Sequence, residues 1–295
     1  MTVHLIGVPF DSAGTTAGVA LAPSALRHAG VVDALRAEGL EVDDRGDVRF
    51  GSTRPDRDPE SGIISPDTLT AMIGAVRDVV GASLTEHGLP LVLGGDCAVL
   101  LGCLAALGSE PIGLLFVDGH EDAWPPHAST TGEAADMELG FLLGRTTNSL
   151  PAELRAAIPR LDASRVVAIG ARDEAELADA GIPSIDDVVD TVRTDGMTPP
   201  ELGAAVEERI QRLDRLGRWW LHVDLDVLST ASLAAVGYRQ RGGLDWSMLT
   251  AITIRALASP RLVGWTVTIY DPGLDPDGTG AVAIVRYLAT ASRRE

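Results

Sequence analysis

The sequence lacks several features that would place it in particular protein classes. It has only two cysteines, Cys97 and Cys103, in one short segment, so we expect no structural disulfide. It has no apolar run near the roughly 20 residues of a membrane span. The opening segment, MTVHLIGVPFDSAG, has neither the basic region nor the long apolar region of a signal peptide. We therefore expect a cytoplasmic protein with no membrane partner.

Basic residues are also scarce. Lys and Arg together number 24 against 42 Asp and Glu, and the formal net charge is −18. A field of this sign repels phosphate backbones, so we expect no nucleic-acid partner. The chain has no G-x-S-x-G elbow and no phosphate-binding glycine loop after a strand. Much of the acidic excess serves solubility, but clustered aspartates also hold divalent cations.

Apolar runs typical of buried strands alternate with longer amphipathic segments along the whole chain. This alternation predicts an α/β protein, a three-layer αβα sandwich with a mostly parallel sheet. No repeat or linker divides the chain, so residues 1–295 are expected to form a single domain, with a long surface loop at 46–65. The predicted strands are 3–8, 89–93, 112–118, 165–169, 219–226 and 262–270, and the predicted helices are 24–38, 66–85, 98–107, 134–143, 174–179, 201–216, 246–258 and 280–292.

Two of the predicted strands end in alternating acidic and histidine residues. In GLLFVDGHEDAWPP the run closes on Asp118, His120 and Asp122, and in WWLHVDLDVLS on His222, Asp224 and Asp226. If the backbone stays extended, alternate side chains share one side of the strand. The carboxyl ends of parallel strands are where open α/β sheets bind ligands, so we expect these side chains to converge.

Several carboxylates on apolar strands need compensating positive charge, because burying them unpaired is unfavourable. One alternative is that they cap helices or pair with arginines, which is common for a single aspartate. Two separate alternations favour a metal pair instead. Carboxylate oxygens with an imidazole suit Mn²⁺ better than a thiolate zinc site.

These segments resemble the ureohydrolase family, which includes arginase, agmatinase, guanidinobutyrase and formimidoylglutamase. The family signatures G-G-D-H, D-A-H-x-D and S-x-D-x-D-x-x-D-P correspond to GGDC at 94–97, DGHED at 118–122 and HVDLDVLST at 222–230. Weaker similarities, such as LAPSALRHAG at 21–30 and DPGLDPDGTGA at 271–281, extend the resemblance over essentially the whole chain.

The resemblance implies an αβα fold, commonly oligomeric, with two manganese ions per chain. Asp118 and Asp224 would bridge the ions, Asp122 would bind the first, and His120 and Asp226 the second. Hydroxide held between the metals would attack the carbon of a linear amidine or guanidino substrate, with Asp122 in a catalytic position.

Cys97 departs from the family, because it stands where relatives have the histidine ligand of the first metal. Thiolate is a soft ligand for manganese, and it would raise the number of anionic ligands to five against roughly four positive charges. We expect Cys97 to be a weak or absent ligand and the first site to be weak or empty. Cys97→His should then tighten this site.

The substrate-binding positions depart as well. Ile269 stands where the family has the glutamate that binds guanidinium, and Trp124 where arginase has an asparagine that holds the substrate carboxylate. Arginine is therefore disfavoured. Trp124 and Glu133 would suit a substrate that is apolar or cationic at that end, unless Glu133 is only a solvated loop acid. The resemblance of IGARD at 169–173 adds Asp173 to the substrate-binding residues.

Two histidines have predicted supporting roles. Ala135 stands at the position of arginase's proton-transfer histidine, and His127 in the nearby loop is a candidate replacement. His222 is expected to orient Asp224 by a hydrogen bond, or else to be satisfied by backbone or water.

The Nω-hydroxyarginine hydrolase of this family has a similar pattern: cysteine for the first histidine, D-G-H-x-D, H-x-D-x-D and no later histidine. That similarity favours an active hydrolase here. The competing hypothesis is a pseudoenzyme that keeps the fold, has lost catalysis and binds a ligand or partner.

Overall fold

Eight parallel strands form one sheet in the computed structural model, which describes residues 2–293. The order across the sheet is β2-β1-β3-β8-β7-β4-β5-β6, so the last strands in sequence lie in its centre. The predicted parallel α/β architecture is confirmed. The strands are β1 (Thr2–Val8), β2 (Glu41–Asp47), β3 (Leu89–Gly94), β4 (Gly113–Val117), β5 (Val166–Ile169), β6 (Asp190–Val192), β7 (Trp219–Asp224) and β8 (Leu262–Thr268).

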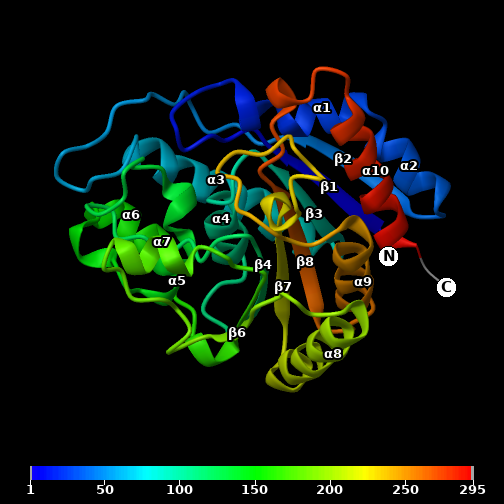
Figure 1. Cartoon of the computed structure of the whole chain (residues 1–295). Helices are drawn as coiled ribbons and strands as arrows, with labels where there is room; N and C mark the ends of the chain where they lie inside the picture. Colours follow the sequence, from blue (N-terminus) through cyan, green and yellow to red (C-terminus); the bar gives the residue numbers. More distant parts are fainter. Residues whose placement is uncertain (1, 294–295) are drawn as a thin grey trace.

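Helices cover both faces of the sheet (Figure 1). One face carries α1 (Ala22–His28), α2 (Val31–Ala37), α8 (Pro199–Leu216), α9 (Trp246–Leu257) and α10 (Thr279–Ser292). The other carries α3 (Pro66–Thr85), α4 (Val99–Ala105), α5 (Glu138–Leu143), α6 (Ala152–Ala157) and α7 (Glu174–Asp179).

Strand residues alternate between the two hydrophobic cores. Leu115 and Val223 pack in the core under α8–α10, whereas Phe116 and Trp220 pack in the core under α3–α6. This alternation follows from the two-residue period of a strand. Residues two positions apart point to the same side of a strand, so Asp118, the first residue after β4, faces the same α3–α6 side as Phe116.

The predicted helix 24–38 is broken in the structure. α1 ends at His28 and α2 begins at Val31, because Gly30 adopts a left-handed conformation with φ of 90°. The predicted helix 134–143 is likewise divided, into a 3₁₀ turn at Ala134–Asp136 and α5.

Two edge strands and one short helix were not predicted. Of the residues in β2 only Val42 is buried, so this strand has no apolar run to reveal it. β6 has three residues and α6 has six. The predicted loop at 46–65 begins at 48, because β2 includes its first two residues. In the part of the chain that the structure describes, no helix is long and apolar enough to cross a membrane.

Candidate metal centre

The predicted acidic residues lie at the carboxyl ends of two neighbouring strands. β4 pairs with β7 in a register that sets Phe116 opposite His222 and Val117 opposite Val223. The next residues, Asp118 and Asp224, therefore leave the sheet side by side. Both are only 1% exposed.

The ligand atoms of these segments converge as predicted. Atoms of Asp118, His120 and Asp122 lie within 4.8 Å of one another, and so do atoms of Asp118, Asp224 and Asp226. Ligands on opposite sides of one divalent ion are about 4–5 Å apart. The cluster therefore has the dimensions of a metal centre with Asp118 common to both groups.

The backbone reaches this arrangement by turning, not by staying extended, so that part of the prediction is wrong. Asp122 has a φ of 43°, and Asp226 lies in a 3₁₀ turn, Leu225–Val227. Asp118 Oδ1 accepts a hydrogen bond from the His120 amide at 2.8 Å, and Asp224 Oδ1 accepts one from the Asp226 amide at 2.9 Å. Aspartate readily stabilises such turns by bonding to the amide two residues on.

Asp226 is held from three directions. The Gly119 amide donates to Oδ1 at 3.0 Å, His120 Nδ1 lies 2.9 Å from Oδ2, and Arg172 Nη2 donates to the Asp226 carbonyl at 2.9 Å. Burial lowers the pKa of His120, but the facing Asp226 carboxylate outweighs this and raises that pKa to about 9. Asp226 and His120 are thus fixed as a pair.

Gly119 is required at its position. A Cβ there would lie 2.7 Å from Asp226 Oδ1 and 3.0 Å from Arg172 Nη2. We expect Gly119→Ala to displace Asp226 and to weaken metal binding by about 10–100-fold, as changes next to metal ligands do. Titration calorimetry with Mn²⁺ measures this. Gly74→Ala, in open space on α3, is the control and should bind normally; normal binding by Gly119→Ala would contradict the expectation.

The chemistry of the cluster fits a cation. Asp118 Oδ2 is buried without a hydrogen-bond partner. Burial raises the pKa values of Asp118, Asp122 and Asp224 well above their usual range. Among the described residues, no lysine or arginine forms an ion pair with these three carboxylates. Pairing with arginines therefore does not explain their burial.

Cys97 lies beside the cluster, but its thiol is hydrogen-bonded to a backbone carbonyl. Its Sγ is within 4.8 Å of ligand atoms of Asp122 and Glu138, and it donates a hydrogen bond to the Ala135 carbonyl at 3.0 Å. Burial, and then the charge of Glu138, raises the pKa of the Cys97 thiol well above its usual value. The preceding Asp96 accepts bonds from the Ser12 and Ala98 amides, which joins two loops.

The predicted substrate-binding residues differ in burial and in their hydrogen-bond partners. Trp124 is partly buried, with its amide bonded to the Asp136 carbonyl at 3.0 Å. The Tyr238 hydroxyl donates to Glu133 Oε1 at 3.0 Å. Burial raises the pKa of Asp173 to about 6, and its Oδ2 accepts the Glu121 amide at 3.2 Å.

Of the two supporting histidines, His222 bonds to another residue than expected, and the role of His127 stays a prediction. His127 is exposed beside Gly62 and belongs to no group of potential metal ligands in the described chain. His222 is fully buried, and its Nδ1 pairs with Thr266 Oγ1 at 3.0 Å instead of with Asp224. Its ring stacks on Phe116, with centroids 5.1 Å apart, and this packing sets the direction of both nitrogens.

Glu138 is a site residue that was not predicted from the sequence. It is 0% exposed, and atoms of its side chain group with Cys97 and Asp122 and also with Asp118 and His222. It begins α5 between two core residues, Met137 and Leu139. An acidic residue between two apolar core positions of the sequence is the signal that could have identified Glu138 as a site residue.

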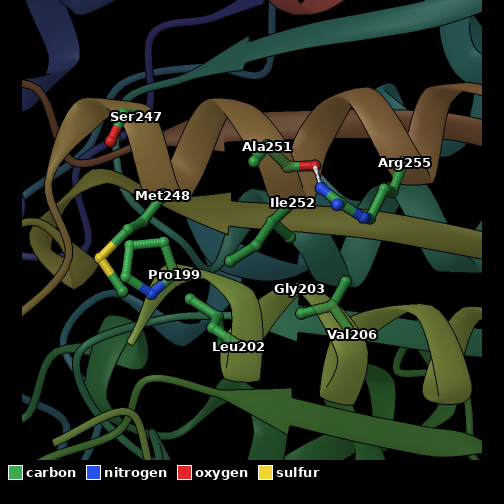
Figure 2. Close-up of a pocket in the computed structure, with 9 residues that line it drawn as sticks. All are labelled: Pro199, Leu202, Gly203, Val206, Ser247, Met248, Ala251, Ile252 and Arg255. Atoms are coloured by element: carbon green, nitrogen blue, oxygen red, sulfur yellow. Dashed lines mark hydrogen bonds between the residues drawn. The ribbon is translucent and has the colours of Figure 1, made fainter. Parts of the chain in front are cut away.

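A separate pocket lies between α8 and α9 (Figure 2). Its volume is about 50 Å³, and Arg255 along its wall donates to the Ala251 carbonyl at 3.0 Å. Substrate pockets are typically several hundred Å³. It contains none of the predicted site residues, and its helices cover the opposite face of the sheet from His222.

Comparison with known proteins agrees with this architecture. A sequence model of the arginase family matches residues 1–292. The arginase of Bacillus caldovelox is 31% identical over 255 residues, 83% of this chain and 82% of that protein. The solved structure of Bacillus caldovelox arginase matches with a TM-score of 0.84 at 24% identity, covering 99% of this chain and 98% of that one. Formimidoylglutamase from Bacillus subtilis matches with a TM-score of 0.73 at 18% identity, covering 99% and 86%. The chain belongs to the arginase family, whose members are hydrolases acting on C–N bonds in amidines.

Proposed function

We propose that this chain hydrolyses a C–N bond of a linear guanidino or amidine compound with two manganese ions at the β4–β7 edge. The observation that carries the proposal is that four buried aspartates and His120 form two groups of ligand atoms, each within 4.8 Å, that share Asp118. Asp118, Asp122 and Asp224 would hold the first ion, and Asp118, His120, Asp224 and Asp226 would hold the second. Manganese in such a site lowers the pKa of water and polarises the group under attack.

The chain's own residues supply orientation and exclude water. The amides of His120 and Asp226 hold one oxygen each of Asp118 and Asp224, and Asp118 Oδ2 has no partner in the described chain. The Thr268 hydroxyl donates to Asp224 Oδ2 at 3.1 Å. His120 is the most exposed of the five proposed ligands, with a side chain that is 14% exposed, and we infer that the substrate approaches past it.

The residues expected to bind the substrate differ from those that arginine requires. Ile269 is apolar and has a φ of 69°, a strained conformation for a β-branched residue. Trp124 is an aromatic surface, and Glu133 and Asp173 are acidic. We infer a substrate with an apolar or cationic end where arginine has its carboxylate. Asp122 as a catalytic group, His127 as proton shuttle, the homo-oligomer and the cytoplasmic location remain predictions.

The test is a panel of guanidino compounds incubated with the Mn²⁺-loaded protein, with release of urea or a substituted urea as the readout. We expect turnover of at least one compound that lacks arginine's free carboxylate, and weaker or no turnover of arginine. A protein that binds two manganese ions but turns over no compound would support the pseudoenzyme alternative. Preference for arginine would refute the inferred substrate class.

Glu133 offers a specific test of this class. Glu133→Gln removes one negative charge and retains an acceptor for the Tyr238 hydroxyl. We expect kcat/KM to fall about 5–10-fold for substrates with a cationic end, as loss of one partly exposed charge pair predicts, and to stay unchanged for apolar ones. An equal fall for both kinds of substrate would show that Glu133 does not bind the cationic end.

A further inference from the structure

Glu138 places a carboxylate in the protein interior beside two other acidic groups, the Asp122 carboxyl and the Cys97 thiol. It is 0% exposed, and neither Oε1 nor Oε2 has a hydrogen-bond partner among the described residues. A buried carboxylate with both oxygens unsatisfied is strongly unfavourable unless a cation or proton meets it. Glu138 begins a helix whose other residues are mostly core, so packing alone does not explain an acid there.

His222 lies at the same place, and one of its ring nitrogens has no partner in the described chain. Thr266 Oγ1 lies 3.0 Å from His222 Nδ1, accepts from Trp220 Nε1 at 3.0 Å and lies 3.4 Å from the Leu221 carbonyl. Thr266 can therefore accept the Nδ1 proton and donate its own proton to Leu221, which leaves a lone pair on Nε2. Nε2 is buried and has no partner in the described chain.

Glu138 and His222 lie together beside Cys97, the position at which relatives have the histidine ligand of the first metal. Atoms of Glu138, His222 and Asp118 lie within 4.8 Å of one another, and Glu138 is equally close to Asp122 and Cys97. Lone pairs and carboxylates facing each other repel unless a cation lies between them. The Cys97 thiol, bonded to the Ala135 carbonyl, leaves this space to the other groups.

We propose that Glu138 and His222 take over the first metal site, so that a carboxylate from α5 and an imidazole from β7 replace the histidine that Cys97 has displaced. Asp118 and Asp122 complete this site. The inference rests on the proposed two-metal function and gives it a different first site from the one expected of the family. Five carboxylates then face two divalent ions, five negative charges against four positive ones. The neutral imidazole of His222 adds no charge, and a thiolate from Cys97 would be a sixth anion. Cys97 is a neighbour of this metal and not its ligand.

A purely structural explanation competes with this one: a protonated Glu138 carboxyl that donates to His222 Nε2. The two explanations differ in metal stoichiometry. Glu138→Gln keeps the shape of the side chain and can donate to Nε2, but it is a poor manganese ligand. His222→Asn keeps a group near the Nδ1 position for Thr266 and removes Nε2.

The experiment counts bound Mn²⁺ by elemental analysis and calorimetry without substrate, and records the Mn²⁺ electron paramagnetic resonance spectrum. We expect two ions and a spin-coupled spectrum for the wild-type chain. Glu138→Gln and His222→Asn should each retain one tightly bound, uncoupled ion, with the other weakened more than about 100-fold. Cys97→Ser, the control, should bind both ions with affinity within about threefold of the wild type, since the thiol is not a ligand.

Two tightly bound ions in both Glu138→Gln and His222→Asn would overturn the proposal, as would one ion in the wild type or the loss of one in Cys97→Ser. Because the two variants change different elements, misfolding of one leaves the other as the test. Metal counts do not depend on turnover. A chain that binds both ions as expected but hydrolyses nothing would sustain the inference while the proposed function fails.

Discussion

Replacing Asp118 with asparagine is expected to abolish hydrolysis, with a fall in kcat of at least about 10³-fold, because loss of metal-ion catalysis removes several kcal/mol of transition-state stabilisation. Asp118 supplies an atom to three of the four potential ligand groups in the described chain. Its Oδ2 is buried and has no hydrogen-bond partner among the described residues. Steady-state rates and Mn²⁺ titration of the variant measure the two effects.

The same substitution should stabilise the chelator-treated protein. Burial, and then repulsion from Asp122 and Asp226, raises the pKa of Asp118, so a neutral amide relieves repulsion that the carboxylate suffers when ionised. We expect a higher melting temperature without metal and a smaller gain with Mn²⁺ than in the wild type. Asp162→Asn, which changes an exposed turn cap, is the matched control. A variant that is less stable without metal and still active would contradict this account of Asp118.

Manganese is expected to stabilise the protein by an amount that grows steeply with pH. With free Mn²⁺ about 1,000 times above the dissociation constant, each site adds about 4 kcal/mol. For a chain of this size, each kcal/mol raises the melting temperature by about 2–4 °C. Two sites should therefore raise it by roughly 15–30 °C at pH 8. Thermal melts with Mn²⁺ and with a chelator, from pH 5 to pH 8, test this.

The buried acids decide whether the stability of the metal-free protein rises or falls with pH. Burial raises the pKa of Asp96 to about 8 and those of Asp136 and Asp173 to about 6. Their stabilising contribution is present below about pH 4 and is lost as the pH rises toward 8, because the unfolded chain then holds fewer protons. His222, whose pKa burial lowers to about 3, opposes this only between about pH 3 and 6.5.

Metal binding displaces protons from the ligand acids Asp118, Asp122 and Asp224, whose pKa values burial raises, so Mn²⁺ affinity increases with pH. The stability of the chelated protein decreases over the same range as the other buried acids ionise. The gap between the two melting curves should therefore widen from pH 5 to pH 8. A gap that is constant across this range would show that proton release from the buried acids does not accompany binding.

The parts of the fold that follow from local pattern were predictable. α3 at Pro66–Thr85 and α7 at Glu174–Asp179 have the predicted bounds, because amphipathic periodicity is a property of one continuous segment. β2 was missed, since only Val42 in it is buried. Gly30, in its left-handed conformation, broke a helix that the apolar pattern on its own favours.

In the candidate site, the sequence by itself determined that Asp118, His120, Asp224 and Asp226 lie at the ends of apolar strands, because acids after a buried run mark the carboxyl edge of a parallel sheet. The tertiary structure decided which other side chains lie against these four residues. His222 bonds to Thr266, 44 residues away, and Glu138 reaches the cluster only because α5 joins the core that also contains Phe116 of β4 and Trp220 of β7. Alternation along a strand is local, whereas the meeting of a helix end with two strands depends on packing across the whole α3–α6 core.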